Sequence, residues 1–405
     1  MLSLATFGAG FLMRPLGAVF LGAYIDRHGR RQGLIITLGL MAMGTLLIAF
    51  VPGYATLGVA APLLVLFGRL LQGFSAGVEL GGVSVYLSEI ATPGRKGFFV
   101  SWQSASQQVA VVFAGLLGVL LNQWLSPQDM GEWGWRVPFL ASVVVMIFAI
   151  WLRMNLKESP VFEKVNDAES VAPVAAQDTS VGAMFKSKSF WLATGLRFGQ
   201  AGNSGLIQTF LAGYLVQTLL FDKAIPTDAL MISSILGFVS IPLLGWLSDK
   251  VGRRLPYIIL NISAIILAYP MLSIIVDKSY APGVIMLSII VIHNFAVLGL
   301  FALENITMAE MFGSRNRFTR MAISKEAGGL VAVGFGPVLA GIFCNMTGSW
   351  WPIVAMLVAY SLIGLVSALL MPEVRDRDLS LVEDAAEPLR QSDTAAKQRK
   401  YGALS

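Results

Sequence analysis

Several charged side chains lie within long apolar stretches of the sequence, where each costs at least about 2.5 kcal/mol to place in a membrane. An arginine there can hold a carboxylate through two parallel hydrogen bonds. A carboxylate there can carry a proton when burial raises its pKa and a neighbouring arginine lowers it. These residue types favour an anionic substrate and proton coupling. The charged residues within the apolar stretches are Arg14, Arg69, Glu79, Arg197, Glu304, Lys325 and Glu326.

The arginines are the candidates for substrate binding. Arg14, Arg69 and Arg197 fall inside their apolar stretches, and we expect them to contact an anion, with helix-bridging Arg–Glu pairs as the alternative. Glu79 and Glu304 are the candidates for proton coupling. Glu79 follows Arg69 by nearly three helical turns, so it needs a partner on another helix.

Other polar residues in the apolar stretches allow two readings. Lys325 and Glu326 lie nearer one end of their stretch, where a functional site and simple pairing or snorkelling explain them equally well. His293 is expected to be a hydrogen-bonded packing residue. The segment around Ser75 also matches the G-x-S-x-G nucleophile pattern, so an intramembrane protease using Ser75 and His293 is the rival class. That rival explains none of the repeats described below.

The composition is that of a polytopic membrane protein. Of the 405 residues, 56% are hydrophobic and 13% charged, against about 25% charged in globular proteins. Continuous apolar runs of about 20 residues predict spanning helices rather than barrel strands. The single cysteine, Cys344, excludes an internal disulfide. It also leaves no metal cluster to build, and we expect no catalytic residue, no metal and no cofactor. The excess positive charge lies in loops between spans, so we expect no nucleic-acid partner. No G-x-x-x-x-G-K motif is present, which argues against nucleotide-driven transport.

The apolar runs predict an all-α protein of two helical bundles. Residues 1–154 would form an N-terminal bundle of five spans and residues 189–371 a C-terminal bundle of six. Residues 155–188 would be a cytoplasmic linker, and residues 372–405 a disordered cytoplasmic tail. The eleven expected spans are 3–24, 33–52, 60–88, 98–122, 136–154, 189–219, 228–248, 255–276, 282–308, 319–345 and 350–371.

Two charged motifs each occur twice, about 220 residues apart, which indicates a duplication. GAYIDRHGRR at 22–31 returns as GWLSDKVGRR at 245–254, and the segment at 88–97 is echoed at 309–317. An aspartate at a helix end can accept hydrogen bonds from the first amides of a facing helix while it pairs with an arginine. We therefore expect a breakable conformational gate formed by Gly22, Asp26, Arg27, Gly29, Arg30, Glu89, Arg95, Asp249, Gly252 and Arg253.

The basic residues predict the orientation. With the Asp26 loop placed in the cytoplasm, 22 of the 29 Lys and Arg residues fall in inner loops, the linker or the tail, whereas the outer loops hold Lys223 and Lys278. The C-terminus would be cytoplasmic. Because the first half has one span fewer than the second, we expect that one span is missing before Met1.

The repeated 22–31 motif resembles the loop motif of the major facilitator superfamily. RLLQGFSAGVE at 69–79 and WGWRVPF at 133–139 are similar to segments of its metabolite:proton symporters. Residues up to about Arg136 are most similar to citrate and tricarballylate proton symporters. From about Trp135 onward, the chain is similar to an uncharacterised enterobacterial inner-membrane metabolite transporter.

This resemblance implies a bacterial inner-membrane protein with substrate between two pseudo-symmetric bundles, and the family's first span would be the missing one. It implies a monomer that carries a small organic anion, such as a di- or tricarboxylate, together with protons. The alternatives are symport of a zwitterionic osmolyte such as betaine or proline, and a truncated product that does not transport.

Overall fold

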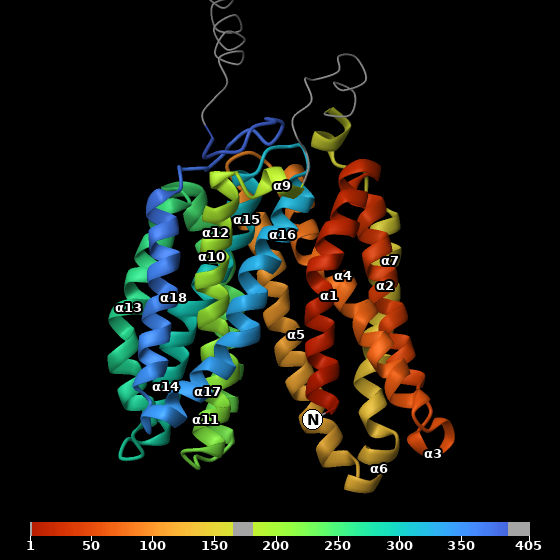
Figure 1. Ribbon diagram of the computed structural model, residues 1–405, viewed down its shortest axis with the longest axis vertical. Coiled ribbons are helices and arrows are strands. Elements are labelled where there is room, and N and C mark those ends of the chain that lie inside the picture. The colour runs from red at the N-terminus through yellow and green to blue at the C-terminus, as the bar shows by residue number, and fades with distance from the viewer. Residues whose placement is uncertain (1, 165–180, 388–405) are drawn as a thin grey trace, which may run out of the picture.

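Long apolar helices stand side by side in two bundles (Figure 1). The computed structural model describes residues 2–164 and 181–387, all of them helix, turn or loop. Within these ranges nine helical segments are long and apolar enough to cross a membrane. α1 and the α10–α11 segment, bounded below, occupy the two other expected spans, so the all-α prediction with about eleven spans is confirmed.

The N-terminal bundle begins with α1 and ends with α7, at the right of Figure 1. Short helices α3 (Tyr54–Leu57), α6 (Pro127–Glu132) and η1 (Gly134–Arg136) lie in its connections. The long helices of this bundle are α1 (Leu2–His28), α2 (Arg30–Phe50), α4 (Ala60–Ile90), α5 (Lys96–Trp124) and α7 (Val137–Met154).

The C-terminal bundle follows the short α9 (Val181–Met184), and three of its spans are interrupted by π-helical turns. Such turns widen a helix locally and often occur at functional sites. The spans are α10–η2–α11 (Lys188–Ser204, Gly205–Leu211, Ala212–Gln217), α12 (Ala224–Val251), α13 (Arg254–Val276), α14–η3–α15 (Pro282–His293, Asn294–Leu298, Gly299–Met311), α16–η4–α17 (Arg317–Gly329, Leu330–Phe335, Gly336–Thr347) and α18 (Trp351–Leu370).

Glycines bring α1 and α4 into backbone contact. Gly73 and Gly77 lie so close to the backbone of Gly10 and Arg14 that a methyl group on either would collide with it. Small residues at such spacing are the usual means of close helix packing in membranes. The contact fixes the height of Arg14 within the bundle.

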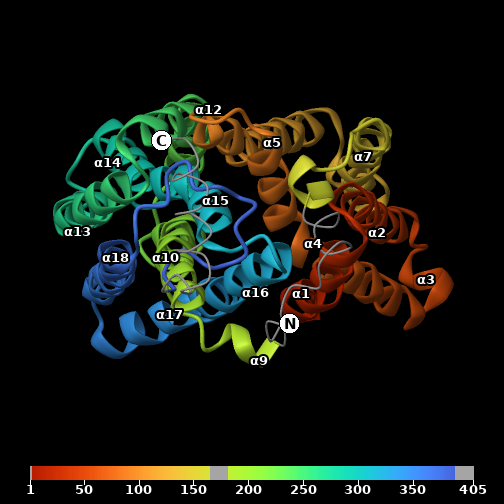
Figure 2. The ribbon, with the colours of Figure 1, turned by 90° about the horizontal axis from the view of Figure 1, so that it is seen from above.

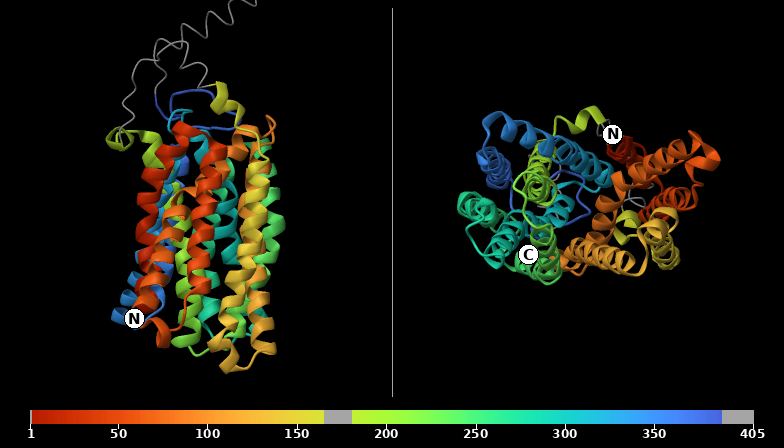
Figure 3. Two further views of the ribbon diagram at one scale, coloured as in Figure 1. Left: turned by 90° about the vertical axis from the view of Figure 1, so that its right-hand side faces the viewer. Right: turned by 90° about the horizontal axis from the view of Figure 1, so that it is seen from below.

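The two bundles meet along two pairs of antiparallel helices. α1 packs against α16, and α5 packs against α12, as the view from above shows (Figure 2). In Figure 1 the bundles are joined at the upper end and diverge toward the lower end. The side view places the start of α1 at that lower end (Figure 3).

The segment after α18 is folded rather than disordered as far as residue 387, which corrects the sequence prediction for the tail. This segment, residues 371–387, is called the strap below. Within the C-terminal bundle the amide of Ser314 donates to the carbonyl of Leu381 at 2.7 Å. Toward the N-terminal bundle, the amide of Gly94 donates to Asp376 at 3.0 Å, and Lys96 Nζ donates to the Arg377 carbonyl at 2.9 Å.

Low hydrophobicity favours disorder in a free chain, but helix ends supply the strap with backbone partners that composition does not reveal. Burial lowers the pKa of Arg377, which donates to the carbonyls of Glu310 and Met311. Residues 165–180 of the expected linker and 388–405 of the expected tail lie outside the described residues.

Replacing Asp384 with alanine is expected to destabilise the protein by about 3–5 kcal/mol, because it removes one partner of a buried ion pair. Asp384 is 5% exposed and accepts from Arg320 at 2.7 Å and from the amide of Gly313 at 2.9 Å. Asp378 is the matched control, because its carboxylate accepts only from nearby Ser380 among the described residues. Thermal unfolding in detergent should show a clearly lower midpoint for Asp384→Ala than for Asp378→Ala, and equal midpoints would contradict this role of the strap.

Candidate functional site

Asp26, at the end of α1, binds the first turn of α16 in the other bundle. Its carboxylate accepts hydrogen bonds from the amide of Thr319 at 2.9 Å and from the Thr319 hydroxyl at 2.7 Å. It also pairs with Arg30 at 2.9 Å. A carboxylate at a helix N-terminus receives both the free amides and the positive end of the helix dipole. We call this contact the first latch.

Asp249, at the end of α12, makes the same contact with α5. Its two oxygens accept from the amides of Gly97 at 2.7 Å and Phe98 at 2.8 Å. Asp249 pairs with Arg253 at 2.9 Å. We call this contact the second latch. The two latches cross the bundle interface in opposite directions, so each bundle both supplies and receives an aspartate.

The arginine of each latch also pairs with a buried glutamate near the end of α4 or α15. Arg253 Nε lies 2.8 Å from Glu310, and both side chains are fully buried. Burial lowers the pKa of Arg253, but the carboxylates of Glu310 and Asp249 more than offset this and raise the pKa above its usual value. In the N-terminal half, Arg30 lies 3.6 Å from Glu89.

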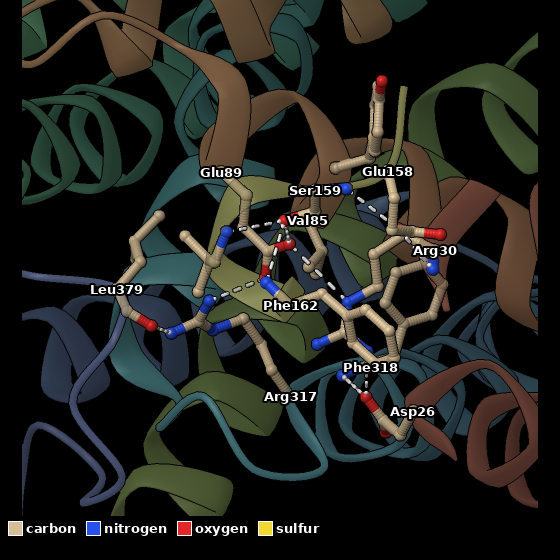
Figure 4. A network of polar contacts seen from close by, with 12 residues as sticks. Asp26, Arg30, Val85, Glu89, Glu158, Ser159, Phe162, Arg317, Phe318 and Leu379 are labelled. Atoms are coloured by element: carbon tan, nitrogen blue, oxygen red, sulfur yellow. Dashed lines mark hydrogen bonds and ion pairs between the residues drawn. The ribbon is translucent and has the colours of Figure 1, made fainter. Parts of the chain in front are cut away.

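Glu89 also reaches across the bundle interface. It accepts from Arg317 at the start of α16 at 2.9 Å, and Figure 4 shows it between Arg30 and Arg317, with Asp26 below. Arg317 is 1% exposed and is held further by the carbonyls of Phe312 and Leu379. The strap therefore supports the cation that joins the two bundles.

Two glutamates that sequence reasoning missed close the network symmetrically. Glu158 accepts from the amide of Arg30 at 2.8 Å, at the start of α2. Glu373 accepts from the amide of Arg253 at 2.8 Å, at the start of α13. Both lie a few residues after the last helix of their bundle. The number of residues between the two glutamates is close to the number between the two copies of each repeated motif. A search for further repeats at that separation would have found them.

The structure brings most of the expected gate residues together and leaves two of them exposed. Gly29 and Gly252 have positive φ angles of 108° and 97°, which the turns after α1 and α12 require, and Gly22 lies against Thr319. Arg27 and Arg95 were also expected in the gate, and both side chains are exposed. Both positions face solvent at the helix end, so they fit a simpler role as loop charges.

A cavity of about 490 Å³ lies between the bundles, deeper than the latches. Its polar lining comes from opposite sides: Arg14 from α1, and Arg197 and Gln200 from α10. All three π-helical turns contribute to its wall. Sequence reasoning missed its glutamines, although uncharged polar residues inside an apolar span are themselves a signal. The glutamines are Gln107, Gln108, Gln200 and Gln208.

Arg14 and Arg197 are the two arginines that the structure brings to the cavity. Arg14 Nε is buried without a hydrogen-bond partner among the described residues, and its guanidinium lies 4.0 Å from the ring centre of Phe11. Arg197 Nη1 lies 3.1 Å from Glu304 and 2.8 Å from Gln200, while its Nε is also unpartnered. The cavity therefore offers N–H donors from both bundles to an anion.

Glu304 is the centre of a buried ion cluster behind Arg197. It is fully buried and also pairs with Lys325 at 3.1 Å. Lys325 is 4% exposed, so it does not snorkel; it pairs with Glu304 instead. Asn305, a partner of Lys325, donates to Gln103 of α5 at 2.6 Å, which ties the cluster to the other bundle.

Arg69 and Glu79 are absent from the lining of this cavity. Arg69 donates to Gln72 at 3.2 Å on its own helix, toward α2 inside the N-terminal bundle. Glu79 pairs with Arg153 of α7 at 2.9 Å. The position of a charge along a span does not tell which way it faces, and both side chains face neighbouring helices of their own bundle.

His293 and Ser75 lie in different bundles with different partners. His293 Nε2 accepts from Gln208 at 2.8 Å, and Nδ1 donates to Ser233 at 2.7 Å. Ser75 donates to the Thr37 carbonyl at 2.5 Å. His293 is thus hydrogen-bonded as expected and also lines the cavity. A Ser75–His293 nucleophile pair is absent from the described chain.

Both the sequence and the fold are similar to those of known transporters. The family model of the Major Facilitator Superfamily matches residues 1–317 and 229–400. The Escherichia coli (strain K12) protein YdfJ, named as a transporter without a stated substrate, is 64% identical over 386 residues, covering 95% of this chain and 90% of that protein. A citrate-proton symporter of Klebsiella pneumoniae is 40% identical over 358 residues, covering 86% and 77%. The proton:xylose symporter XylE is similar in fold, with a TM-score of 0.71, 17% identity and coverage of 94% and 88%.

Proposed function

The chain belongs to the major facilitator superfamily, and within it to the metabolite:proton symporters; from this we propose that it carries a small organic anion across the bacterial inner membrane together with protons. It is a multi-pass transporter and not an enzyme. We further propose that the anion is a di- or tricarboxylate.

The observation that carries this proposal is the pair of arginines that face one cavity from opposite bundles. Arg14 and Arg197 each have an unpartnered Nε, and the lining includes no Asp or Glu within the described residues. Guanidinium groups match carboxylates in geometry and charge. An anion with two carboxylates could engage both bundles at once, whereas the ammonium of betaine or proline would find no carboxylate in the lining. The name of the Klebsiella relative adds citrate and protons as precedents.

The proposed cycle alternates access to this cavity. In the present conformation both latches are closed, and we propose that they seal the cytoplasmic side, because the basic loops gather at that end. Opening would break the amide bonds of Asp26 and Asp249 together with the Glu89–Arg317 pair. The two bundles would then rock about the site at their interface.

Uptake into proteoliposomes tests the function. Purified protein should accumulate labelled citrate, tricarballylate or α-ketoglutarate when an inward proton gradient is imposed, and should accumulate much less when a proton ionophore removes the gradient. Betaine serves as the zwitterionic comparison. Absence of gradient-dependent accumulation of every anion would contradict the proposal, and accumulation of betaine alone would replace the anion by an osmolyte.

A further inference from the structure

Glu326 lies opposite Arg14, across the interface between the bundles. α16 runs antiparallel to α1 and α4, since its first turn meets their last. Gly81 of α4 lies against Ala322 of α16. One turn further along α16 is Glu326, and one turn back along α4 is Gly77, which touches the backbone of Arg14. Arg14 and Glu326 therefore lie at the same level of the interface.

Glu326 differs from the other acidic residues inside the spans. Its side chain is half-buried and makes no hydrogen bond or ion pair with the described residues. Glu79 is held by Arg153, and Glu304 by both Arg197 and Lys325. A carboxylate fixed by two cations gives up its charge only at a high cost in free energy. Glu326 can gain or lose a proton without breaking such a pair.

Charged groups of several helices surround Glu326. The charged groups near enough to influence its charge are Arg14 of α1, Arg197 of α10, Glu304 of α15 and Lys325, which precedes it on α16. With every group ionised, three cations and two carboxylates leave the cluster one net positive charge. When Glu326 is protonated, the cluster has two.

We propose that Glu326 carries the coupled proton and thereby sets the charge of the anion site. The inference rests on the proposed function and names the group that performs its coupling. Protonation forms an O–H bond on the Glu326 carboxyl and removes one negative charge from the surroundings of Arg14, so the site attracts a substrate carboxylate more strongly. Proton and dianion then bind cooperatively, because each raises the affinity for the other by the same factor.

The same charge balance favours movement only of the loaded site. A dianion in a cluster of two positive charges leaves no net charge at the interface. A dianion beside ionised Glu326 leaves one uncompensated negative charge, which is unfavourable to bury when the bundles close around it. Release of the proton on the other side restores the negative charge of Glu326, which repels the anion and favours its release.

Glu326→Gln tests this inference in proteoliposomes, because exchange of internal for external substrate requires no net proton movement. With the labelled carboxylate that the wild type accumulates, Glu326→Gln should keep exchange within about threefold and lose gradient-driven accumulation by tenfold or more, a change of at least about 1.4 kcal/mol in coupling. Its substrate affinity should also be constant between pH 5.5 and 8. Glu79→Gln is the matched control and should remain coupled.

The outcomes separate this inference from the proposed function. Glu326→Gln that accumulates substrate like wild type overturns the role of Glu326 and leaves anion symport intact. A wild type that neither exchanges nor accumulates any anion overturns both. If Glu326→Gln loses exchange as well, Glu326→Asp decides: recovery of both activities supports a titrating carboxyl at this position, and failure of Glu326→Asp to recover coupling refutes it.

Discussion

Replacing Arg14 with glutamine is expected to lower anion uptake by about 10- to 100-fold. The substitution removes a charged donor that faces the cavity, and hydrogen bonds to charged groups contribute about 1.5–3 kcal/mol each. Arg14 Nε has no hydrogen-bond partner in the described chain, so the fold loses little when the guanidinium is removed. The loss should appear mainly as weaker binding, measured as a higher KM for uptake and a higher Kd in a direct binding assay.

Arg69→Gln provides the control, because both arginines lie inside apolar spans and only Arg14 lines the cavity. Arg69 contacts Gln72 within the N-terminal bundle, so its replacement should leave KM within about threefold of wild type. Equal losses in the two variants would mean that the cavity described here is not the substrate site.

The latches could be predicted from the sequence because their parts are local and repeated. An aspartate at a helix end, a glycine in the following turn and an arginine four residues after the aspartate form a unit within one helix–turn–helix, and its second copy fixed the symmetry. The partner amides at Thr319 and Gly97 follow from that symmetry, since each repeated motif must face the other bundle. The ion pair between Glu89 and Arg317 could be found only from the three-dimensional structure.

The residues of the cavity were harder to predict, because the direction in which a side chain points depends on how its helix is rotated about its own axis. Arg14 and Arg69 look equivalent in the sequence, yet contacts between glycines rotate α1 and α4 so that one reaches the interface and the other does not. Lys325 and Glu326 are adjacent in the chain and therefore point about 100° apart on a helix. Lys325 therefore pairs with Glu304, whereas Glu326 lies at the level of Arg14 across the interface.

Asp249→Asn is expected to shift the protein by at least about tenfold toward a conformation that is open at the latch end. The variant keeps one acceptor oxygen but loses the charge that strengthens the amide bonds from Gly97 and Phe98 and the pair with Arg253. Charged hydrogen bonds exceed neutral ones by roughly 1 kcal/mol each, so the loss is about 2–4 kcal/mol. In the closed conformation of the variant, Arg253 would also keep only Glu310 of its two carboxylate partners.

Spin labels measure this shift directly. Arg95→Cys and Lys250→Cys, in a Cys344→Ser background, place exposed labels on either side of the second latch. Wild type should give one short distance between the labels, and Asp249→Asn should add a longer one. Asp277→Asn is the matched control, because this exposed aspartate lies on the loop between α13 and α14 and accepts only from Ser279 in the described chain. An unchanged distance distribution in Asp249→Asn would show that the second latch does not hold the bundles together, because the lost charge would then have no effect on the closed state.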